Sequence, residues 1–531
     1  MDTRMLPNEI WIYVFESMTR PSELFKVIQS CKQFYALAIR VLYRNVQWLS
    51  PFHFTQNISF WDRQTAAMSE VPTSLTVGIS HMYGTLFGRF DPAAVVVEAD
   101  GTWAVNVTPS MGNFVHGPHD LKPLSFFASA TLFKAVSSRI SSFTKLEELI
   151  FHRASLPTII YTVIQTLPRL RHLCIQYCSL PPSVIDSNLG FASLPITELT
   201  LLCVKENIAV IPESHYVAAL LLATASNLRI LRVDWTTVSA VFFAQLNPNI
   251  QYELPAKLEV LEVRMPIAKF WPSDGHRGLI DPLCSFLKKC PKIMQFIVMN
   301  RLPSLPLTRT TIPNLRSYSG PLSTVFSVLR GRTVEHLEIT DDDKKLEDLV
   351  NALPELAEIQ PSLQTLCIFL CRWDNEVLYP ISEHFTNLRR LQIKYQESNP
   401  SEVHFNFIYK QSDTIANSLF LSEYVILSLG SQFLYRLPQL HTLQIYNDIP
   451  ISSSVISFDP IHPQHTDSLP LWVTDHEPDL GPTGDDVFED IKELIVAWRK
   501  HCRNLREVQL VGGVVWRRAF DGDEWSQRVL E

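Results

Sequence analysis

The chain has 531 residues, 46% hydrophobic and 19% charged, so it is long enough for a large core and too apolar to be disordered. Its formal net charge is −8 and no Lys/Arg cluster stands out, which argues against nucleic acid as the main partner. The 17 glycines are few for a chain of this length, which disfavours enzymes that cradle phosphates in glycine-rich loops.

The nine cysteines are sparse, and most of them lie inside apolar runs. An odd number of cysteines without a secretory leader favours reduced thiols in the cytoplasm or the nucleus. The longest apolar run, 217–225, is too short to span a bilayer. We therefore expect a cytoplasmic and/or nuclear protein that does not enter a membrane.

The first predicted helix lies within LPNEIWIYVFESM (6–18) and is apolar on two faces. One face holds Ile10, Val14 and Ser17, and the other holds Trp11, Phe15 and Met18. Two further helices are expected within 22–43, with a joint near 30–32. A three-helix unit of this size rarely folds without a staple or a partner. We therefore expect one apolar face to pack inside the unit and the other to be reserved for another protein.

This stretch resembles the F-box. The family pattern Leu-Pro-x-Glu-Ile is present at 6–10, and the later pattern of an apolar residue followed by x-x-Cys-Lys-x-Phe is present at 28–34. Met18 departs from the usual leucine, and the tryptophan that often closes the motif is absent. A plain N-terminal helical hairpin, packed on the domain behind it, is the alternative.

The resemblance implies a Skp-type adaptor as partner and, through it, a cullin-RING ubiquitin ligase. Carried over residue by residue, the adaptor contacts are expected at Leu6, Pro7, Ile10, Val14, Leu24, Val27, Cys31 and Phe34.

From Leu146 onward, the pattern Leu-x-x-Leu-x-apolar recurs and predicts one strand per copy. The copy at 170–180 fits the leucine-rich-repeat signature Leu-x-x-Leu-x-Leu-x-x-Cys-x-Leu at every specified position. The copies begin at Leu146, Leu170, Ile196, Leu228, Leu258, Ile293, Leu315, Val334, Leu363, Leu388, Leu440 and Leu505. Their spacing up to Leu388 suits one strand and one helix per unit. The segment 71–79 is a candidate for a degenerate first strand.

The expected fold is α/β: an N-terminal three-helix F-box followed by an open leucine-rich-repeat solenoid, with a curved parallel sheet and outer helices. The repeats are similar to the irregular leucine-rich repeats attached to F-boxes in many fungal proteins. A general α/β fold, such as a barrel, is the alternative. It is disfavoured because a closed barrel has eight strands and the sequence offers more candidates.

The expected boundaries follow from these patterns. The F-box takes 1–47, and 48–125 is a linker and N-terminal cap of the solenoid. The irregular leucine-rich-repeat domain takes 126–515, with insertions near 395–436 and 447–490. Residues 516–531 form a C-terminal cap or tail, in which Trp516 and Trp525 are expected to cover the core of the last repeat.

No motif for catalysis or for a cofactor is found: Walker loop, dinucleotide fingerprint and nucleophile elbow are all absent. The histidine pairs at 116/119 and 462/465 have no suitable cysteine or carboxylate nearby. Cys178 and Cys371 fit the Asn/Cys position of the repeat better than a zinc or redox site. We expect no enzyme activity, metal or cofactor.

The leading hypothesis is a substrate-recognition subunit of a Skp-cullin-F-box (SCF) type ubiquitin ligase, with the F-box on the adaptor and the repeats on a protein substrate. Outward strand residues form the candidate substrate face: Arg232, Asp234, Glu262, Arg264, Arg390, Lys394, Tyr446 and Glu507. The alternatives are a non-ligase leucine-rich-repeat interaction scaffold and, less favoured, an α/β-repeat enzyme. The sequence does not name the substrate or any modification that it needs.

Overall fold

The computed structural model of the chain describes 6–18, 21–49, 54, 61, 66–78, 95–97, 103–105, 135–154, 156, 159–178, 191–202, 219–245, 255–266, 277–302, 304–340, 346–372, 374–397, 429–447, 492–511, 514–520 and 523–529. The two histidine pairs and most of both expected insertions lie outside these ranges. No helix among the described residues is long and apolar enough to cross a bilayer.

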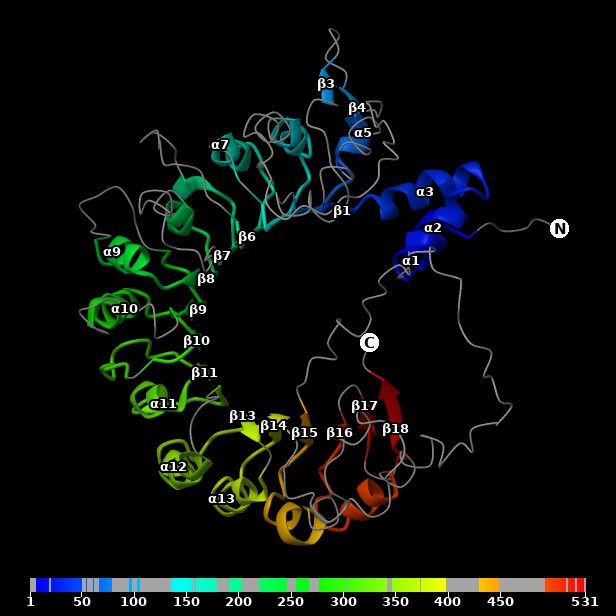
Figure 1. The fold of residues 1–531 in the computed structure, drawn as a ribbon. Helices are drawn as coiled ribbons and strands as arrows, with labels where there is room; N and C mark the ends of the chain where they lie inside the picture. Colours follow the sequence, from blue (N-terminus) through cyan, green and yellow to red (C-terminus); the bar gives the residue numbers. More distant parts are fainter. Residues whose placement is uncertain are drawn as a thin grey trace, which may run out of the picture. The chain divides into compact units, whose positions relative to one another are not determined.

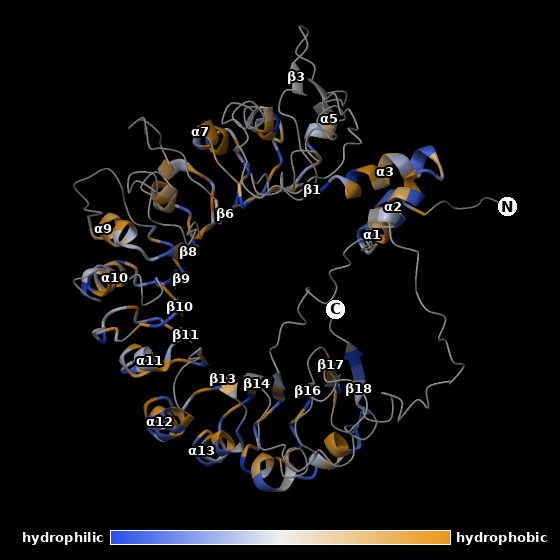
Figure 2. Cartoon of the chain, viewed as in Figure 1, coloured by the Kyte–Doolittle hydropathy of each residue, from blue (hydrophilic) through white to orange (hydrophobic). Residues whose placement is uncertain are grey.

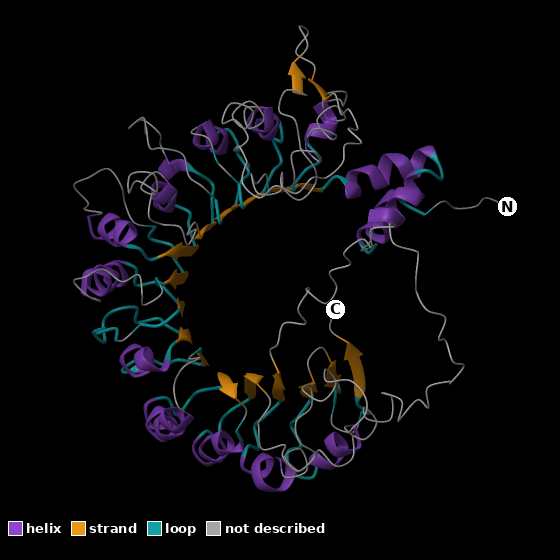
Figure 3. Ribbon diagram, in the orientation of Figure 1, coloured by secondary structure: helices purple, strands orange, loops and turns teal. Residues whose placement is uncertain are grey.

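The chain forms two compact units, Met1–Ile293 and Met294–Glu531. In each unit the strands follow the concave side of an arc and the helices cover the outer side (Figures 1 and 3). The structure is thus α/β with a curved, mostly parallel sheet, which is compatible with a leucine-rich-repeat solenoid.

The first unit begins with three helices, α1 (Asn8–Glu16), α2 (Pro21–Ile28) and α3 (Lys32–Leu42). The break between α2 and α3 confirms the predicted joint near 30–32. These helices share a core that centres on Phe15, Leu24, Ile28 and Ala38. The three-helix part of the prediction is confirmed, whereas its identity as an F-box stays a prediction.

Seven parallel strands follow in the first unit, and each hydrogen-bonds to the next along the chain. They are β1 (Asn45–Trp48), β2 (Ser74–Val77), β5 (Glu148–His152), β6 (His172–Gln176), β7 (Glu198–Leu202), β8 (Ile230–Asp234) and β9 (Val260–Arg264). A separate antiparallel pair is formed by β3 (Val95–Val97) and β4 (Trp103–Val105).

The second unit continues the same pattern. Its parallel strands are β10 (Gln295–Met299), β11 (Ser317–Gly320), β12 (His336–Ile339), β13 (Thr365–Arg372), β14 (Arg390–Glu397), β15 (Thr442–Asn447) and β16 (Glu507–Val511). Two antiparallel strands close the order, β17 (Val514–Arg517) and β18 (Ser526–Val529). Trp516 and Trp525 are buried there, as expected for a cap.

The helical elements of the outer layer differ in length and type. They are α5 (Ala66–Ser69), α7 (Ile159–Gln165), η3 (Phe191–Ser193), η5 (Leu221–Thr224), α9 (Thr237–Gln245), α10 (Arg277–Lys289), α11 (Leu322–Leu329), α12 (Leu346–Ile359), η7 (Asn375–Val377), α13 (Leu378–His384), η10 (Leu429–Phe433) and η11 (Leu434–Arg436). The largely hydrophobic α7 buries four of its residues (Figure 2). Between β7 and β8 the outer layer includes the 3₁₀ turn η5, whose four residues are buried.

The repeat pattern places the strands accurately. Each strand from β5 to β16 begins two residues after the first residue of its predicted copy, as in Leu170 and β6. These first residues are at most 1% exposed. Within β6, Leu173 and Ile175 are buried while His172 is exposed, because successive side chains of a strand point to opposite faces.

Two placements differ from the sequence-based prediction, and one predicted strand is confirmed. The sheet begins at Asn45, inside the range 1–47 assigned to the F-box, because Val46 and Trp48 alternate into the core of β1. The predicted degenerate strand within 71–79 is confirmed as β2, so the sheet extends into the range 48–125. Cys371 is exposed, unlike the buried Cys178, because β13 runs on to Arg372.

Candidate protein-binding sites

Helix α1 carries the two faces that its sequence indicates. On the inner face, Phe15 is 1% exposed, and its ring lies 5.3 Å from that of Phe34 in α3. Trp11 lies 4.6 Å from the same ring, measured between centroids. On the outer face, Ile10 is 47% exposed and Val14 is 36% exposed. The aromatic cluster therefore holds the helices together while the second face remains open.

The open face begins before the helix. Leu6 is 50% exposed just before α1, and the spacing of four between Ile10 and Val14 places these two in one stripe along the helix. Large exposed apolar residues also occur at Tyr13 in α1, at Phe25 in α2 and at Tyr35 in α3. The family pattern did not single out these three. The sequence feature that could have identified them is an apolar residue that neither helical stripe needs to build the core.

The expected adaptor contacts divide into two groups. Leu6, Pro7, Ile10, Val14 and Cys31 are exposed. Leu24 is only 5% exposed and belongs to the core, which corrects its assignment as a direct contact. Val27 and Phe34 are partly buried against that core. The physical reason is size: a three-helix unit must use these residues to fill its own interior.

Cys31 has a structural role in addition to its exposure. It is the N-cap of α3, and its Sγ accepts a hydrogen bond from the backbone N–H of Phe34 at 3.4 Å. At the start of α1, the Gln33 side chain donates to the Asn8 side chain at 3.0 Å, which joins the N-terminal ends of α3 and α1. The exposed ends of the helices are thus fixed relative to each other.

Arg44 connects the three helices to the sheet. Its Nη1 lies 2.6 Å from Oε1 of Glu16 at the end of α1, and its carbonyl accepts from the N–H groups of Thr73 and Ser74. A groove of about 1200 Å³ lies at this junction, with Met18 and Leu42 of the helices and Glu148 of the sheet among its lining residues.

In the first unit, the face of the strands that points away from the helices carries a ladder of charged and polar pairs. We call this face the outward face of the strands. Arg232 contacts Glu262 at 3.3 Å and donates to Thr200, so these side chains stabilise one another across neighbouring strands. Arg264 follows Glu262 two residues later on β9, where it opposes Asp234 of β8. Asp234 belongs to the same face but is 2% exposed, so it is not available to a partner, in contrast to our expectation.

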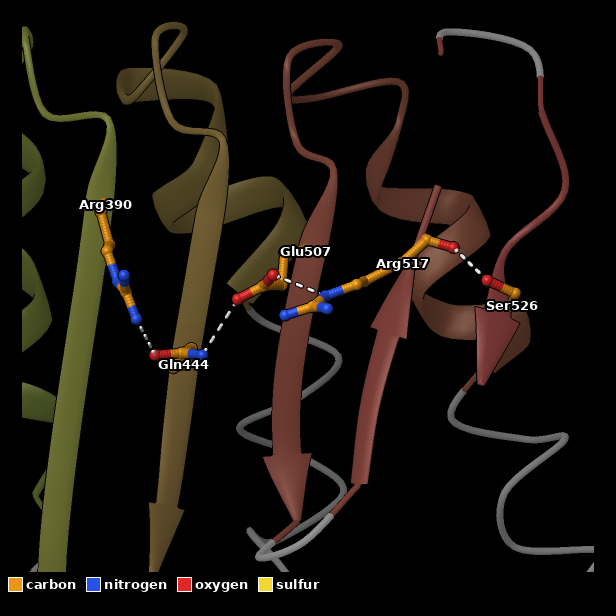
Figure 4. Close-up of polar contacts among 5 residues, drawn as sticks. All are labelled: Arg390, Gln444, Glu507, Arg517 and Ser526. Carbon is orange, nitrogen blue, oxygen red and sulfur yellow. Dashed lines mark hydrogen bonds and ion pairs between the residues drawn. The ribbon is translucent and has the colours of Figure 1, made fainter. Parts of the chain in front are cut away.

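In the second unit, four side chains from four adjacent strands are joined in series (Figure 4). Arg390 donates to Gln444 Oε1 at 3.0 Å, and Gln444 Nε2 donates to Glu507 Oε1 at 3.1 Å. The other carboxylate oxygen of Glu507 accepts from Arg517 Nε at 2.7 Å. The main-chain carbonyl of Arg517 accepts in turn from the hydroxyl of Ser526 on β18.

The remaining expected residues, Lys394 and Tyr446, oppose each other in the register of β14 and β15. Tyr446 accepts a hydrogen bond from Gln392 at 2.8 Å. The structure therefore brings Arg390, Lys394, Tyr446 and Glu507 onto one face of three neighbouring strands. Sequence reasoning missed Gln392 and Gln444, whose signal is a polar residue at the same alternating position of consecutive strands.

Several thiols of the chain are largely removed from water. Desolvation by burial raises the pKa of Cys367 to about 12, and the nearby Glu338 carboxylate adds to the effect. Burial likewise raises the pKa of Cys290 to about 12 and that of Cys174 to about 11. Thiols with such pKa values are weak nucleophiles near neutral pH. Within the described ranges, no group of three or more His, Cys, Asp or Glu is placed to hold a metal ion.

The chain was compared with known proteins. No protein-family model matches it, and no curated protein matches it. Among solved structures it is similar to a chain of the "Crystal structure of TLR13-ssRNA13 complex", with 11% sequence identity and a TM-score of 0.22. That similarity covers 63% of this chain and 52% of the other, about half the length of the solved protein.

Proposed function

We propose that this chain is the substrate-recognition subunit of an SCF-type ubiquitin ligase. In this proposal, α1–α3 bind a Skp-type adaptor, and the outward strand faces bind a protein substrate. The observation that carries the proposal is the exposed apolar stripe of Ile10 and Val14, with Leu6 exposed just before the helix, on a helical unit that already has its own core.

The stripe has a physical reason to bind a protein. Apolar area that leaves water contributes about 25 cal/mol per Å². A set of large apolar side chains on adjacent helical turns therefore gives a compact hydrophobic contact, typical of an interaction surface. The fit of 6–10 and 28–34 to the F-box pattern supports an adaptor of the Skp type over other helical partners.

The chain contributes no catalysis in this proposal. A substrate held on the strands while the adaptor links the chain to a cullin-RING ligase reacts at a high effective concentration, so ligation is promoted by proximity. This function places the protein in the cytoplasm or the nucleus, where cullin ligases act.

The first test is co-purification with a Skp-type adaptor. We expect the double variant Ile10→Ser/Val14→Ser to lose at least tenfold of its adaptor binding, since two exposed apolar contacts are removed. Thermal unfolding should be nearly unchanged, because neither side chain belongs to the core. Val241→Ser is the matched control, because Val241 is 51% exposed on α9. Full binding by the double variant would contradict the proposal.

A second test separates a ligase subunit from an interaction scaffold. A cullin should be present in the complex recovered with the wild-type chain and absent with Ile10→Ser/Val14→Ser. An adaptor complex without any cullin would favour the scaffold.

A further inference from the structure

The outward face of β14–β17 has a positive charge, unlike the chain as a whole. Its charged side chains are Arg390, Lys394 and Arg517 against Glu507, in a chain whose formal net charge is −8. We infer that this face binds an extended acidic segment of a protein through the carboxylates of Asp or Glu. The inference rests on the proposed function, since the segment would belong to the substrate.

The hydrogen-bonded series prepares the face for this ligand. Gln444 is 6% exposed and bridges Arg390 to Glu507, while Glu507 uses both oxygens on Gln444 and Arg517. The one carboxylate, that of Glu507, is therefore satisfied within the series. The two ends of the series are the guanidinium groups of Arg390 and Arg517 (Figure 4). Arginines held in place lose little entropy when a carboxylate binds, and they can offer two parallel N–H donors.

The distances between the cationic side chains of this face determine which spacing of acidic residues in the bound segment fits them. Arg390 and Lys394 are four residues apart on one strand, which corresponds to about 13 Å. Arg390 and Arg517 are separated by three strand-to-strand steps in the register, about 14 Å. An extended peptide advances by about 3.4 Å per residue, so acidic residues at i and i+4 match either distance.

The corresponding face of the first unit has the opposite character. Glu148, Glu198 and Glu262 lie on the outward positions of β5, β7 and β9. Glu198 pairs with His172 at 3.1 Å, and Glu262 pairs with Arg232. Arg232 and Arg264 offset two of these three carboxylates, so this face is slightly negative and the charge pattern favours β14–β17 for an acidic segment.

The probe is a labelled 12-residue Ser/Thr/Gly peptide with glutamates at positions 2, 6 and 10, and binding to the full chain is followed by fluorescence anisotropy. Three peptides control for the chemistry: one with glutamines, one with glutamates at 4, 6 and 8, and one with phosphoserines at 2, 6 and 10. We expect the first peptide to bind most tightly, and its binding to weaken as salt is raised above about 0.1 M.

Two variants test the face. Arg390→Gln/Lys394→Gln should weaken binding of the glutamate peptide at least fivefold. Gln444→Met keeps every charge but removes the bridge, so a severalfold loss would show that positioning matters. The matched control is Arg229→Gln/Lys257→Gln, which removes two exposed cations of the first unit and should stay within about twofold of wild type.

Three outcomes would overturn the inference: equal binding of the glutamine peptide, no binding of any peptide by the wild type, or equal losses in the face variant and its control. Binding of the phosphoserine peptide alone would overturn the assignment to carboxylates. Adaptor co-purification is measured on the same preparations. A face variant that still binds the adaptor while losing the peptide separates this inference from the proposed function.

Discussion

Gly320 shows how a single residue limits the packing of the second unit. A Cβ at this position would clash with the hydroxyl oxygen of Tyr318. That ring is fully buried, and its hydroxyl is 2.5 Å from Thr324 Oγ1, so a shift of the ring would break this hydrogen bond. Glycine is required here by close approach between side chain and backbone.

We therefore predict that Gly320→Ala lowers the free energy of unfolding by about 1–3 kcal/mol, the usual effect of overpacking a core. Gly278→Ala is the matched control, because no atom lies within 4 Å of its new Cβ, and it lies in α10, where alanine is favoured over glycine. The measurement is the midpoint of urea denaturation. Equal stability of the two variants would show that the Tyr318 ring moves freely.

The thiols allow a prediction at the same scale. Only the thiolate reacts with iodoacetamide, and a thiol with a pKa of about 12, such as Cys367 or Cys290, has roughly one thiolate in 10⁴ at pH 8. We expect the two exposed thiols, Cys31 and Cys371, to be alkylated before the buried ones, with mass spectrometry as the readout. Raising the pH should increase labelling of the buried thiols. Labelling of Cys31 should slow when the adaptor is bound, and unchanged labelling would place the adaptor elsewhere.

At the scale of elements, the strands could be predicted from the sequence and the outer helices only in part. Each strand copy begins with an apolar residue, such as Leu315, that must be buried to stack one repeat on the next, so even a poor copy forms a strand. The outer layer has a weaker constraint, since any segment that covers the core suffices. The 3₁₀ turn at Leu221–Thr224, for example, covers the core between β7 and β8 with four buried residues.

The polar face was harder to predict for another reason. Charge and alternation place Arg390 and Glu507 outward, but the bridge between them depends on Gln444, which a search for charged residues overlooks. The prediction that Asp234 is exposed is wrong. Alternation along the strand points its side chain outward, but neighbouring residues cover it. Exposure depends on packing across strands, which a single strand's sequence does not contain.

Arg518 gives a prediction for the terminal strands. Its buried side chain donates Nε to the Leu505 carbonyl at 2.7 Å and Nη2 to the Arg503 carbonyl at 2.8 Å, and its Cζ lies 5.1 Å from the ring centroid of Trp525. Arg518→Met would leave two carbonyls without these donors, so we expect a loss of about 2–4 kcal/mol. Hydrogen exchange should accelerate in β17 and β18, while exposed Arg528→Met leaves it unchanged.

For the whole molecule, the helical core and the sheet are built from separate sets of residues. Among the residues that the structure describes, the core around Phe15 and Ala38 draws on 11–42, and the first strand follows at Asn45. We predict that a chain starting at Tyr43 keeps the strand signal in its circular dichroism spectrum and keeps the unfolding temperature of the sheet. It should no longer bind the adaptor. Loss of the cooperative transition of the strands would show that the helices are part of their fold.

The contacts of Arg44 have a consequence for the reach of the proposed ligase. Only Tyr43 and Arg44 separate α3 from β1, and Arg44 is bonded to α1 by its side chain and to the sheet by its carbonyl. Such a joint has little slack, so an adaptor bound on α1 and the first strands of the sheet keep one relative orientation. A protein held on those strands would present only some of its lysines to the ubiquitin donor.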